Sequence, residues 1–409
     1  MKNGWVKHRL RDVTTKIGSG ATPIGGEAAY KSEGISLIRS LNVHDSGFRT
    51  KGLAFIDETQ AEQLDNVVVE AEDILLNITG ASVARCCVVP DEMLPARVNQ
   101  HVSILRPKKN ELLPKLLHYM LISTDYKDRL LNAGEGGGST RQALTKSQLQ
   151  EFWIEIPESL AEQRRIVGIL DEAFEGLATA NANAEQNLQN ARALFESHLQ
   201  AVFTQLRSAH PVRRLSDLCE RITKGSSPTW QGMAYVDRPG VLFVTSENVH
   251  ENRLVVTTPK YVEERFNEKE KRSILKFGDV LTNLVGASIG RTAVYDLHDV
   301  ANINQAVGVI RCHSDKIHNH YLMYFFNSPV MKAFFHANEV NNARANISLT
   351  FVSELEVPLP PVEGQKEVVR CIREYHQNCQ RLESLYQRKL AALDELKKSL
   401  LHRAFSGQL

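Results

Sequence analysis

The glycine-rich stretch GEGGGST, which begins at Gly134, is the first segment whose residue types suggest chemistry. A phosphate-binding loop needs a lysine at a fixed spacing, a following Ser or Thr, and a strand that leads into it. This stretch has no such lysine, and no strand of the required kind precedes it. We therefore interpret it as a loop and not as a nucleotide site.

Histidine, cysteine and carboxylate residues offer no better catalytic centre. The segment CHSDKIHNH, from Cys312, does not have the ligand spacing of a tetrahedral zinc site. His44 and His250 each follow a β-rich run and suit a hydrogen-bonded turn better than a general base. Glu72 and Asp73 are expected at a turn on the surface. The sequence therefore predicts a binding protein with no cofactor and no metal of its own.

Length and composition indicate how many domains the chain can form. The chain has 409 residues, of which 42% are hydrophobic and 24% charged, so it can bury two or more cores. Its net charge is +1, so any nucleic-acid surface must be local. We expect neither an export signal nor a membrane span, because no window holds 18 apolar residues, and the expected location is the cytoplasm.

The sequence repeats itself once. NITGASVAR from Asn77 matches NLVGASIGR from Asn283, and LRDVTTKIGSGATP from Leu10 matches LSDLCERITKGSSP from Leu215. The matches keep one order and an offset of about 205 residues. A single long period of this kind indicates a duplicated domain.

Each copy has a globular part and then a helical part. β-rich runs such as ISLIRSLNV and DILLNITG precede one helical stretch, PKLLHYMLISTDYKDRLL, and a long segment without proline follows. We therefore predict an α+β chain built from two mixed α/β domains, each followed by a long helix. The expected boundaries are 1–157 and 208–361 for the domains, and 158–207 and 362–409 for the helices.

Both long helices carry apolar residues in 4-3-4-3 steps, as a coiled-coil seam requires. In the first helix the expected seam is Ile166, Leu170, Ala173, Leu177, Ala180, Ala184, Asn187, Ala191, Leu194 and His198. In the second it is Val368, Ile372, Tyr375, Cys379, Leu382, Tyr386, Lys389, Leu393, Leu396 and Leu400. Asn187 and Lys389 occupy equivalent layers, which suggests a polar layer that fixes the register. The alternative is two unrelated amphipathic helices on separate domains.

Chain connectivity favours an antiparallel pair. The second domain leaves the C-terminal end of the first helix and returns into the N-terminal end of the second. Compact domains usually have neighbouring termini, whereas parallel helices would hold these two ends about 50 Å apart. We therefore expect an antiparallel coiled coil with pseudo-twofold, circular symmetry.

The phrases IPESLAEQ and LPPVEGQ before the helices, and the closing SLLHRAFSGQL, resemble the specificity subunit of type I restriction-modification systems. The resemblance covers essentially the whole chain, and its most specific parts are the two-copy layout and the helices. One departure is Gly364, which stands where the first copy, and usually the family, has a glutamate (here Glu162), and we expect this change to affect a contact at the helix start.

The resemblance implies that each globular part is a target recognition domain reading one half of a bipartite double-stranded DNA site. Two copies of the methylating subunit would dock on the chain, and an ATP-driven restriction subunit would join them. S-adenosylmethionine, ATP and Mg would belong to those partners, and this chain would be non-catalytic. The alternatives are a self-contained DNA-modifying enzyme and a coiled-coil scaffold that does not bind DNA.

The repeat also sorts residues by role. If the domains read different half-sites, positions that are identical in both serve the fold or the phosphates, and Arg85 and Arg291 are the phosphate candidates. Base readers are expected where the copies diverge, because Arg, Asn, Gln and Glu can each bond to particular base edges. The candidates are Thr22, Arg39, Arg141 and Gln142 in the first domain, and Thr229, Trp230, Glu247, Asn342, Arg344 and Asn346 in the second.

Overall fold

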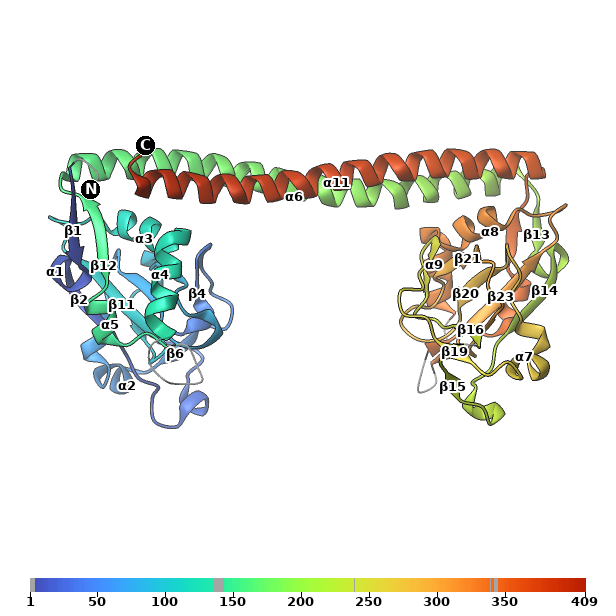
Figure 1. Cartoon of the computed structure of the whole chain (residues 1–409), viewed down its shortest axis with the longest axis horizontal. Helices are drawn as coiled ribbons and strands as arrows, with labels where there is room; N and C mark the ends of the chain where they lie inside the picture. The colour runs from blue at the N-terminus through green and yellow to red at the C-terminus, as the bar shows by residue number, and fades with distance from the viewer. Residues whose placement is uncertain (1–3, 136–142, 239, 339, 342–344) are drawn as a thin grey trace. The chain divides into compact units, whose positions relative to one another are not determined.

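The computed structural model describes residues 4–135, 143–238, 240–338, 340–341 and 345–409. The chain forms two compact units, Met1–Ala184 with Arg388–Leu409, and Glu185–Gln387. Each unit joins one globular domain to part of each long helix, α6 (Leu160–Ala209) and α11 (Val362–Ser406) (Figure 1). No helix in the described ranges is both long and apolar enough to cross a membrane.

The first domain contains two four-stranded sheets. The central sheet, in the order β2-β11-β8-β9, consists of β2 (Thr14–Ser19), β11 (Val102–Pro107), β8 (Ile74–Asn77) and β9 (Cys86–Val88). The outer sheet, in the order β6-β3-β10-β7, consists of β6 (Ala54–Ile56), β3 (Ile35–Ile38), β10 (Ala96–Val98) and β7 (Val68–Val69). The central pairs are antiparallel, whereas β3 and β10 run parallel.

The central sheet separates two hydrophobic cores. Successive side chains of a strand point to opposite faces. Accordingly, Ile74 and Leu76 of β8 pack in the core beneath the helices, while Leu75 packs in the core shared with the outer sheet. The near-continuous apolar run of this strand follows from burial on both faces.

The second domain repeats this topology. Its central sheet, β14-β23-β20-β21, consists of β14 (Cys219–Lys224), β23 (Val307–Cys312), β20 (Val280–Asn283) and β21 (Thr292–Val294). Its outer sheet, β15-β19-β16-β22, consists of β15 (Tyr235–Val236), β19 (Tyr261–Val262), β16 (Val241–Val244) and β22 (Ala301–Ile303), with β16 and β22 parallel. The duplication inferred from the sequence is thus a duplication of fold.

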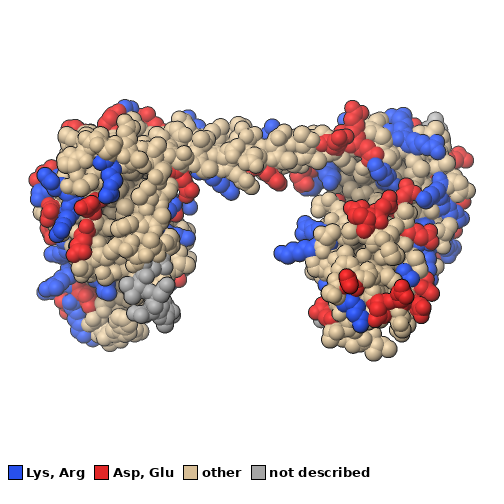
Figure 2. Space-filling view, turned by 180° about the vertical axis from the view of Figure 1, so that it is seen from behind, with Lys and Arg blue, Asp and Glu red and all other residues tan. Residues whose placement is uncertain are grey.

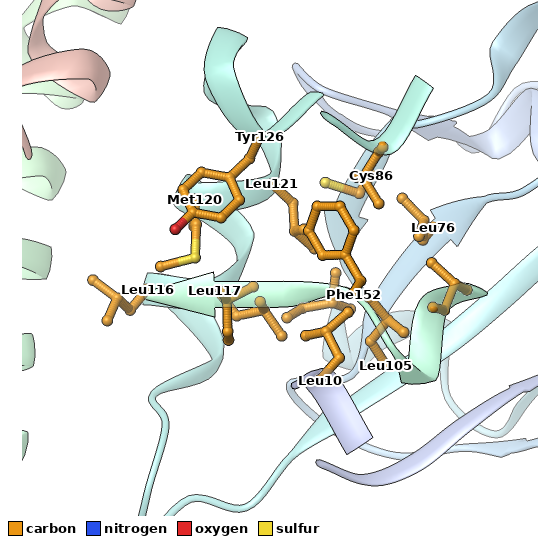
Figure 3. Packing of buried hydrophobic residues seen from close by; sticks show 14 of the residues in the cluster. Leu10, Leu76, Cys86, Leu105, Leu116, Leu117, Met120, Leu121, Tyr126 and Phe152 are labelled. Atoms are coloured by element: carbon orange, nitrogen blue, oxygen red, sulfur yellow. The ribbon is translucent and has the colours of Figure 1, made fainter. Parts of the chain in front are cut away.

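Short helices cover one face of each central sheet. They are α3 (Pro114–Ile122), α4 (Thr124–Glu135) and α5 (Lys146–Gln150) in the first domain, and α8 (Asn319–Phe326), α9 (Pro329–Ala337) and α10 (Leu349–Glu354) in the second. Figure 3 shows Leu117 and Met120 of α3 in the first core with Tyr126 and Phe152.

The expected single helical stretch in each domain is two helices. Ser123 takes an extended conformation between α3 and α4, and its Oγ donates to the Met120 carbonyl at 2.6 Å. Ser328 does the same between α8 and α9, donating to Phe325 at 2.6 Å. A serine hydroxyl that bonds to the backbone in this way competes with the helical hydrogen bond, which explains the break.

A two-stranded ribbon ties the start of each domain to its end. In the first domain β1 (Trp5–Arg9) pairs with β12 (Trp153–Pro157), and in the second β13 (Val212–Arg214) pairs with β26 (Glu356–Pro358), both antiparallel. Each long helix begins within four residues of the end of such a ribbon. The remaining short elements include α1 (Leu10–Val13), α2 (Glu58–Glu62), α7 (Phe266–Lys269), β4 (Val43–His44), β5 (Gly47–Phe48), β17 (Val249–His250), β18 (Arg253–Leu254), β24 (Val340–Asn341) and β25 (Ala345–Asn346).

A buried glutamine attaches the first domain to α6. Gln163 has no exposed surface. Its Oε1 accepts from the Leu113 amide at 3.0 Å, and its Nε2 donates to the carbonyls of Glu111 and Pro157, both at 2.9 Å. One side chain thus satisfies three backbone groups that the domain would otherwise leave without partners in its interior.

Gln365 performs the same role at α11. Its Oε1 accepts from the His318 amide at 2.8 Å, and its Nε2 donates to the carbonyls of Lys316 and Pro360 at 3.0 and 2.9 Å. Gly364, the departure from the first copy, therefore leaves the contact between helix and domain intact. At the equivalent position of the first copy, Glu162 bonds on the surface to Arg165, its one hydrogen-bond partner among the described residues.

The long helices run antiparallel within each unit. In the first, Lys397 lies over the Phe174 ring at 5.3 Å, and Arg165 donates to the Leu409 carbonyl at 2.8 Å. Residue numbers therefore rise along α6 as they fall along α11. The second unit shows the same direction, because the ring of Phe195 stacks on His376 at 4.2 Å, the ring of His198 stacks on Tyr375 at 4.0 Å, and Arg192 pairs with Glu383 at 3.3 Å.

The buried stripe of these helices includes most of the expected seam. Ile166, Leu170, Leu177, Ile372 and Cys379 are all buried. Ala184 and Ala191 are buried as well. The partly buried residues of the expected seam are Ala173, Ala180, His198, Val368, Tyr375, Tyr386, Leu393 and Leu400.

At the remaining five positions the inward side chain is displaced by one residue, which corrects the expected seam. Five residues expected inside are exposed: Asn187, Leu194, Leu382, Lys389 and Leu396. The partly buried residues beside them are Leu188, Phe195, Glu383, Leu390 and Lys397. An α-helix drifts by ~20° per heptad against a strict 3.5-residue repeat, and this drift turns the neighbouring position inward. The polar register layer expected at Asn187 and Lys389 is therefore wrong.

Candidate nucleic-acid interface

The repeat turn, residues 77–85 in the first domain and 283–291 in the second, begins where β8 and β20 end. Asn77 and Asn283 are buried, and the Nδ2 of each donates to two backbone carbonyls. The acceptors are Ser40 (2.9 Å) and Val43 (3.3 Å) for Asn77, and Ser246 (3.0 Å) and Val249 (3.3 Å) for Asn283. The repeated asparagine therefore holds the turn against the neighbouring hairpin.

Arg85 and Arg291 close the two repeat turns. Their backbones are fixed, because the carbonyl of each accepts from the amide of the turn asparagine, at 2.8 Å for Arg85 and 2.9 Å for Arg291. Arg85 is partly buried and Arg291 is exposed, and neither guanidinium forms an ion pair with a described residue. An unpaired arginine on a fixed turn suits a phosphate contact, which stays a prediction for both.

The structure divides the base-reader candidates of the first domain. Thr22 bonds through Oγ1 to Gln100, on a partly exposed loop. Arg39 is occupied by the protein itself, because it pairs with Glu27 at 2.8 Å and donates to the Gly52 carbonyl at 2.7 Å. Its side chain is only 16% exposed. Arg39 is therefore poorly placed to read a base. Arg141 and Gln142 lie outside the described residues.

In the second domain, Trp230 is 74% exposed, and Thr229 shares a hydrogen bond of 2.8 Å with Ser227. Glu247 pairs with Lys260 at 2.8 Å on the surface, and that lysine lowers the pKa of the carboxylate through a hydrogen bond and its charge. Asn346 lies in β25, while Asn342 and Arg344 lie outside the described residues.

A buried arginine–aspartate pair in each domain was missed by sequence reasoning. Arg106 contacts Asp73 through two bonds of 2.8 Å, and Arg311 contacts Asp279 through bonds of 2.8 and 2.7 Å. Asp73 has no exposed surface, so its expected place on the surface is wrong. The hydrogen bonds to these carboxylates raise the pKa of both arginines. The signal was available, because both residues of the pair recur in the repeat.

The histidine expected to be hydrogen-bonded at a turn has such a partner. The Nε2 of His44, the last residue of β4, lies 3.0 Å from the carbonyl of Leu41, in the turn that precedes β4. This local contact gives the ring a structural partner.

Charge on the visible face of each unit is mixed. Figure 2 shows basic and acidic side chains interspersed on both. A net charge of +1 agrees with this distribution. The face that Figure 2 shows is therefore not uniformly basic, and attraction of a polyanion to this face would depend on individual cations.

Comparison with known proteins gives one consistent result. Residues 2–189 and 210–390 match the model of the type I restriction modification DNA specificity domain. The EcoBI specificity subunit of a type I restriction enzyme from Escherichia coli is 23% identical, over 90% of this chain and 87% of the relative.

Solved structures share the fold over the full length. The crystal structure of the HsdS subunit from Thermoanaerobacter tengcongensis has a TM-score of 0.64 and 19% identity, covering 100% of this chain and 98% of the other. A chain solved in the assembly of a type I R-M system has a TM-score of 0.75 and 18% identity, covering 100% and 99%. With two matched domains that span most of its length, this chain belongs to the family of the type I restriction modification DNA specificity domain.

Proposed function

We propose that this chain is the DNA-binding specificity subunit of a type I restriction-modification complex and that it reads a bipartite, asymmetric site in double-stranded DNA. Each globular domain reads one half-site. The observation that carries the proposal is a duplicated fold with an unchanged framework and divergent loops. The framework residues that recur are the buried glutamines, the arginine–aspartate pairs and the turn asparagines.

In this proposal the recurring framework supports the fold or holds phosphates, and the divergent loops contact the bases. Identical residues in two domains cannot distinguish two different sequences, so they support the fold or hold phosphates. The surface around Trp230 and Glu247 has no identical counterpart in the first domain, and such loops are where base contacts are expected. An asymmetric target follows from one chain that carries two unlike reading surfaces.

Catalysis in this proposal belongs to other subunits. Two methylating subunits dock on the chain and use S-adenosylmethionine, and a restriction subunit uses ATP and Mg. The chain itself positions these partners and carries no reaction step. A self-contained DNA-modifying enzyme would need to bind the methyl donor alone, which calorimetry on the isolated chain would detect.

Exchange of one domain tests the proposal. Residues 208–357 are replaced by the second domain of another family member, and the chain is expressed with its methylating partner. Sequencing of methylated adenines in the host should show a split target in which one half-site has changed and the other is retained. A scaffold that does not bind DNA would leave the methylated sequence as it was, and a change in both halves would contradict one domain per half-site.

A further inference from the structure

The second domain has a hollow of about 490 Å³ beside the edge strand β15 of its outer sheet. Tyr235, Asp237, Arg238, Lys260 and Tyr261 line it. Tyr235 is 53% exposed, whereas Tyr261 is 9% exposed and forms the inner wall. An arginine, a lysine and two aromatic rings around one hollow are groups that contact nucleic acids.

Arg238 is held in a fixed orientation in this hollow. Its Nε donates to the hydroxyl of Tyr261, and its guanidinium lies 5.0 Å from the centre of the same ring. The pairing of Val236 with Tyr261 across β15 and β19 places the tyrosine beside the segment that carries the arginine. Stacking and a hydrogen bond at Nε leave both terminal nitrogens of the guanidinium without a partner among the residues that the structure describes, so they can donate as a pair.

No acidic side chain among the described residues forms an ion pair with Arg238. Lys260, which also lines the hollow, pairs with Glu247 at 2.8 Å. This distinguishes Arg238 from Arg39 in the first domain, whose guanidinium also lies over a tyrosine, Tyr30, at 5.1 Å but is bound by Glu27. Of these two stacked arginines, Arg238 is the one whose donors are available to a ligand.

The arrangement belongs to the second domain alone. By strand register, Phe55 stands in the first domain where Tyr261 stands in the second, so the hydroxyl that holds Arg238 has no counterpart there. Ser32 occupies the place of Arg238 at the offset of the repeat. A residue that distinguishes one half-site from the other must differ between the domains, and this pair meets that requirement.

We propose, resting on the function proposed above, that Arg238 contacts a guanine in the half-site read by the second domain, with Tyr261 as its positioning residue. The paired donors of Arg238 match O6 and N7 of guanine in the major groove. Asp237 lies in the same hollow and can accept from N4 of the paired cytosine. Tyr235 offers an exposed ring for contact with the neighbouring base.

The test uses the full chain in complex with its methylating subunit and a DNA library in which the second half-site is randomised. Arg238→Ala should reduce the preference for guanine at one position by about tenfold to a hundredfold and leave the other positions unchanged. Tyr261→Phe, which keeps the ring and removes the hydroxyl, should reduce that preference by a smaller factor. Arg265→Ala is the matched control, because Arg265 is an exposed arginine of the same domain that is paired with Glu263.

Three results would overturn the inference. They are an unchanged preference in Arg238→Ala, a loss of affinity that is equal for all sequences and lowers the salt dependence as a phosphate contact does, and a native second half-site without a G·C pair. Failure of the proposed function looks different, since the wild-type complex would then show no preference for any split sequence. Circular dichroism of each variant verifies that the chain is folded.

Discussion

The two domains share a topology, but equivalent positions in them do not accept the same side chains. Ala84 and Gly290 hold the same place in the repeat turn, and both have a positive φ, +65° and +81°. The first domain accepts an alanine there, with its side chain fully buried. In the second, a Cβ on Gly290 would lie 2.8 Å from Cδ2 of Phe335. Duplication therefore preserved the turn, while the packing around each copy decides which side chains the turn can carry.

The arginine–aspartate pairs should show the largest difference between the domains. Asp279→Ala should destabilise the second domain by about 3–5 kcal/mol, because it leaves a buried arginine without its carboxylate. Asp73→Ala should cost less, since Arg106 keeps its pairing with Glu70 and is 21% exposed, compared with 9% for Arg311. Hydrogen exchange in the central strands of the full chain measures both. Asp315→Ala, at an exposed site of the second domain, is the control, and equal costs for the two buried aspartates would contradict the argument.

The buried glutamines should show no difference. Gln163→Leu and Gln365→Leu should each destabilise the contact between helix and domain by about 3 kcal/mol, because each leaves three backbone groups without partners. Denaturant unfolding followed by hydrogen exchange at the start of α6 and α11 gives the two values. A large effect at one helix only would break the equivalence of the two attachments.

Exchanging the equivalent residues of the two repeat turns should destabilise the second domain and leave the stability of the first nearly unchanged. Gly290→Ala should cost about 2 kcal/mol, from the positive φ and the close approach of Phe335. Ala84→Gly should change stability by less than about 1 kcal/mol, because relief of the positive φ offsets the lost methyl group and the added freedom of the unfolded chain. Thermal unfolding of the full chain compares them. A neutral Gly290→Ala would show that the second turn adapts as the first does.

Low pH should destabilise the first domain through His118, and this is the smallest of the expected effects on stability. Burial lowers the pKa of His118 to about 4, from 6.5, so the unfolded state binds the proton first. Stability should therefore fall as the pH drops from about 6.5 to about 4, by about 1–2 kcal/mol between pH 7 and 5. His118→Met introduces the residue of the second domain, Met323, and should remove this loss. Hydrogen exchange in α3 at the two pH values measures it, and unchanged acid sensitivity would contradict this assignment.

Of the recurring framework, the turn residues could be predicted from the sequence, whereas the roles of the buried glutamines and of the arginine–aspartate pairs were not predicted. Asn77, Asn283, Arg85 and Arg291 were found because they recur, and the structure places them in matching turns. Arg39 was chosen because it diverges, yet Glu27 and the Gly52 carbonyl bind it. Divergence alone cannot distinguish an available side chain from one that is bound within its own domain. Arg238 was overlooked for the converse reason, since only the fold brings Tyr261 beneath it.

The sequence by itself determined the duplication, the order of domain and helix in each copy, and the antiparallel direction of the helices. These features depend on repeated residues, on periodicity and on chain connectivity, all of which are local or additive along the chain. Tertiary structure alone decided which residue of each long helix turns inward at five of the expected seam positions, such as Leu396, which is exposed while Lys397 covers Phe174. It also decided that Asp73 is buried and that the terminal nitrogens of Arg238 are available to a ligand. The reason is that burial depends on what packs against a residue, and a difference of one position, about 100° around a helix, separates an inward side chain from an outward one.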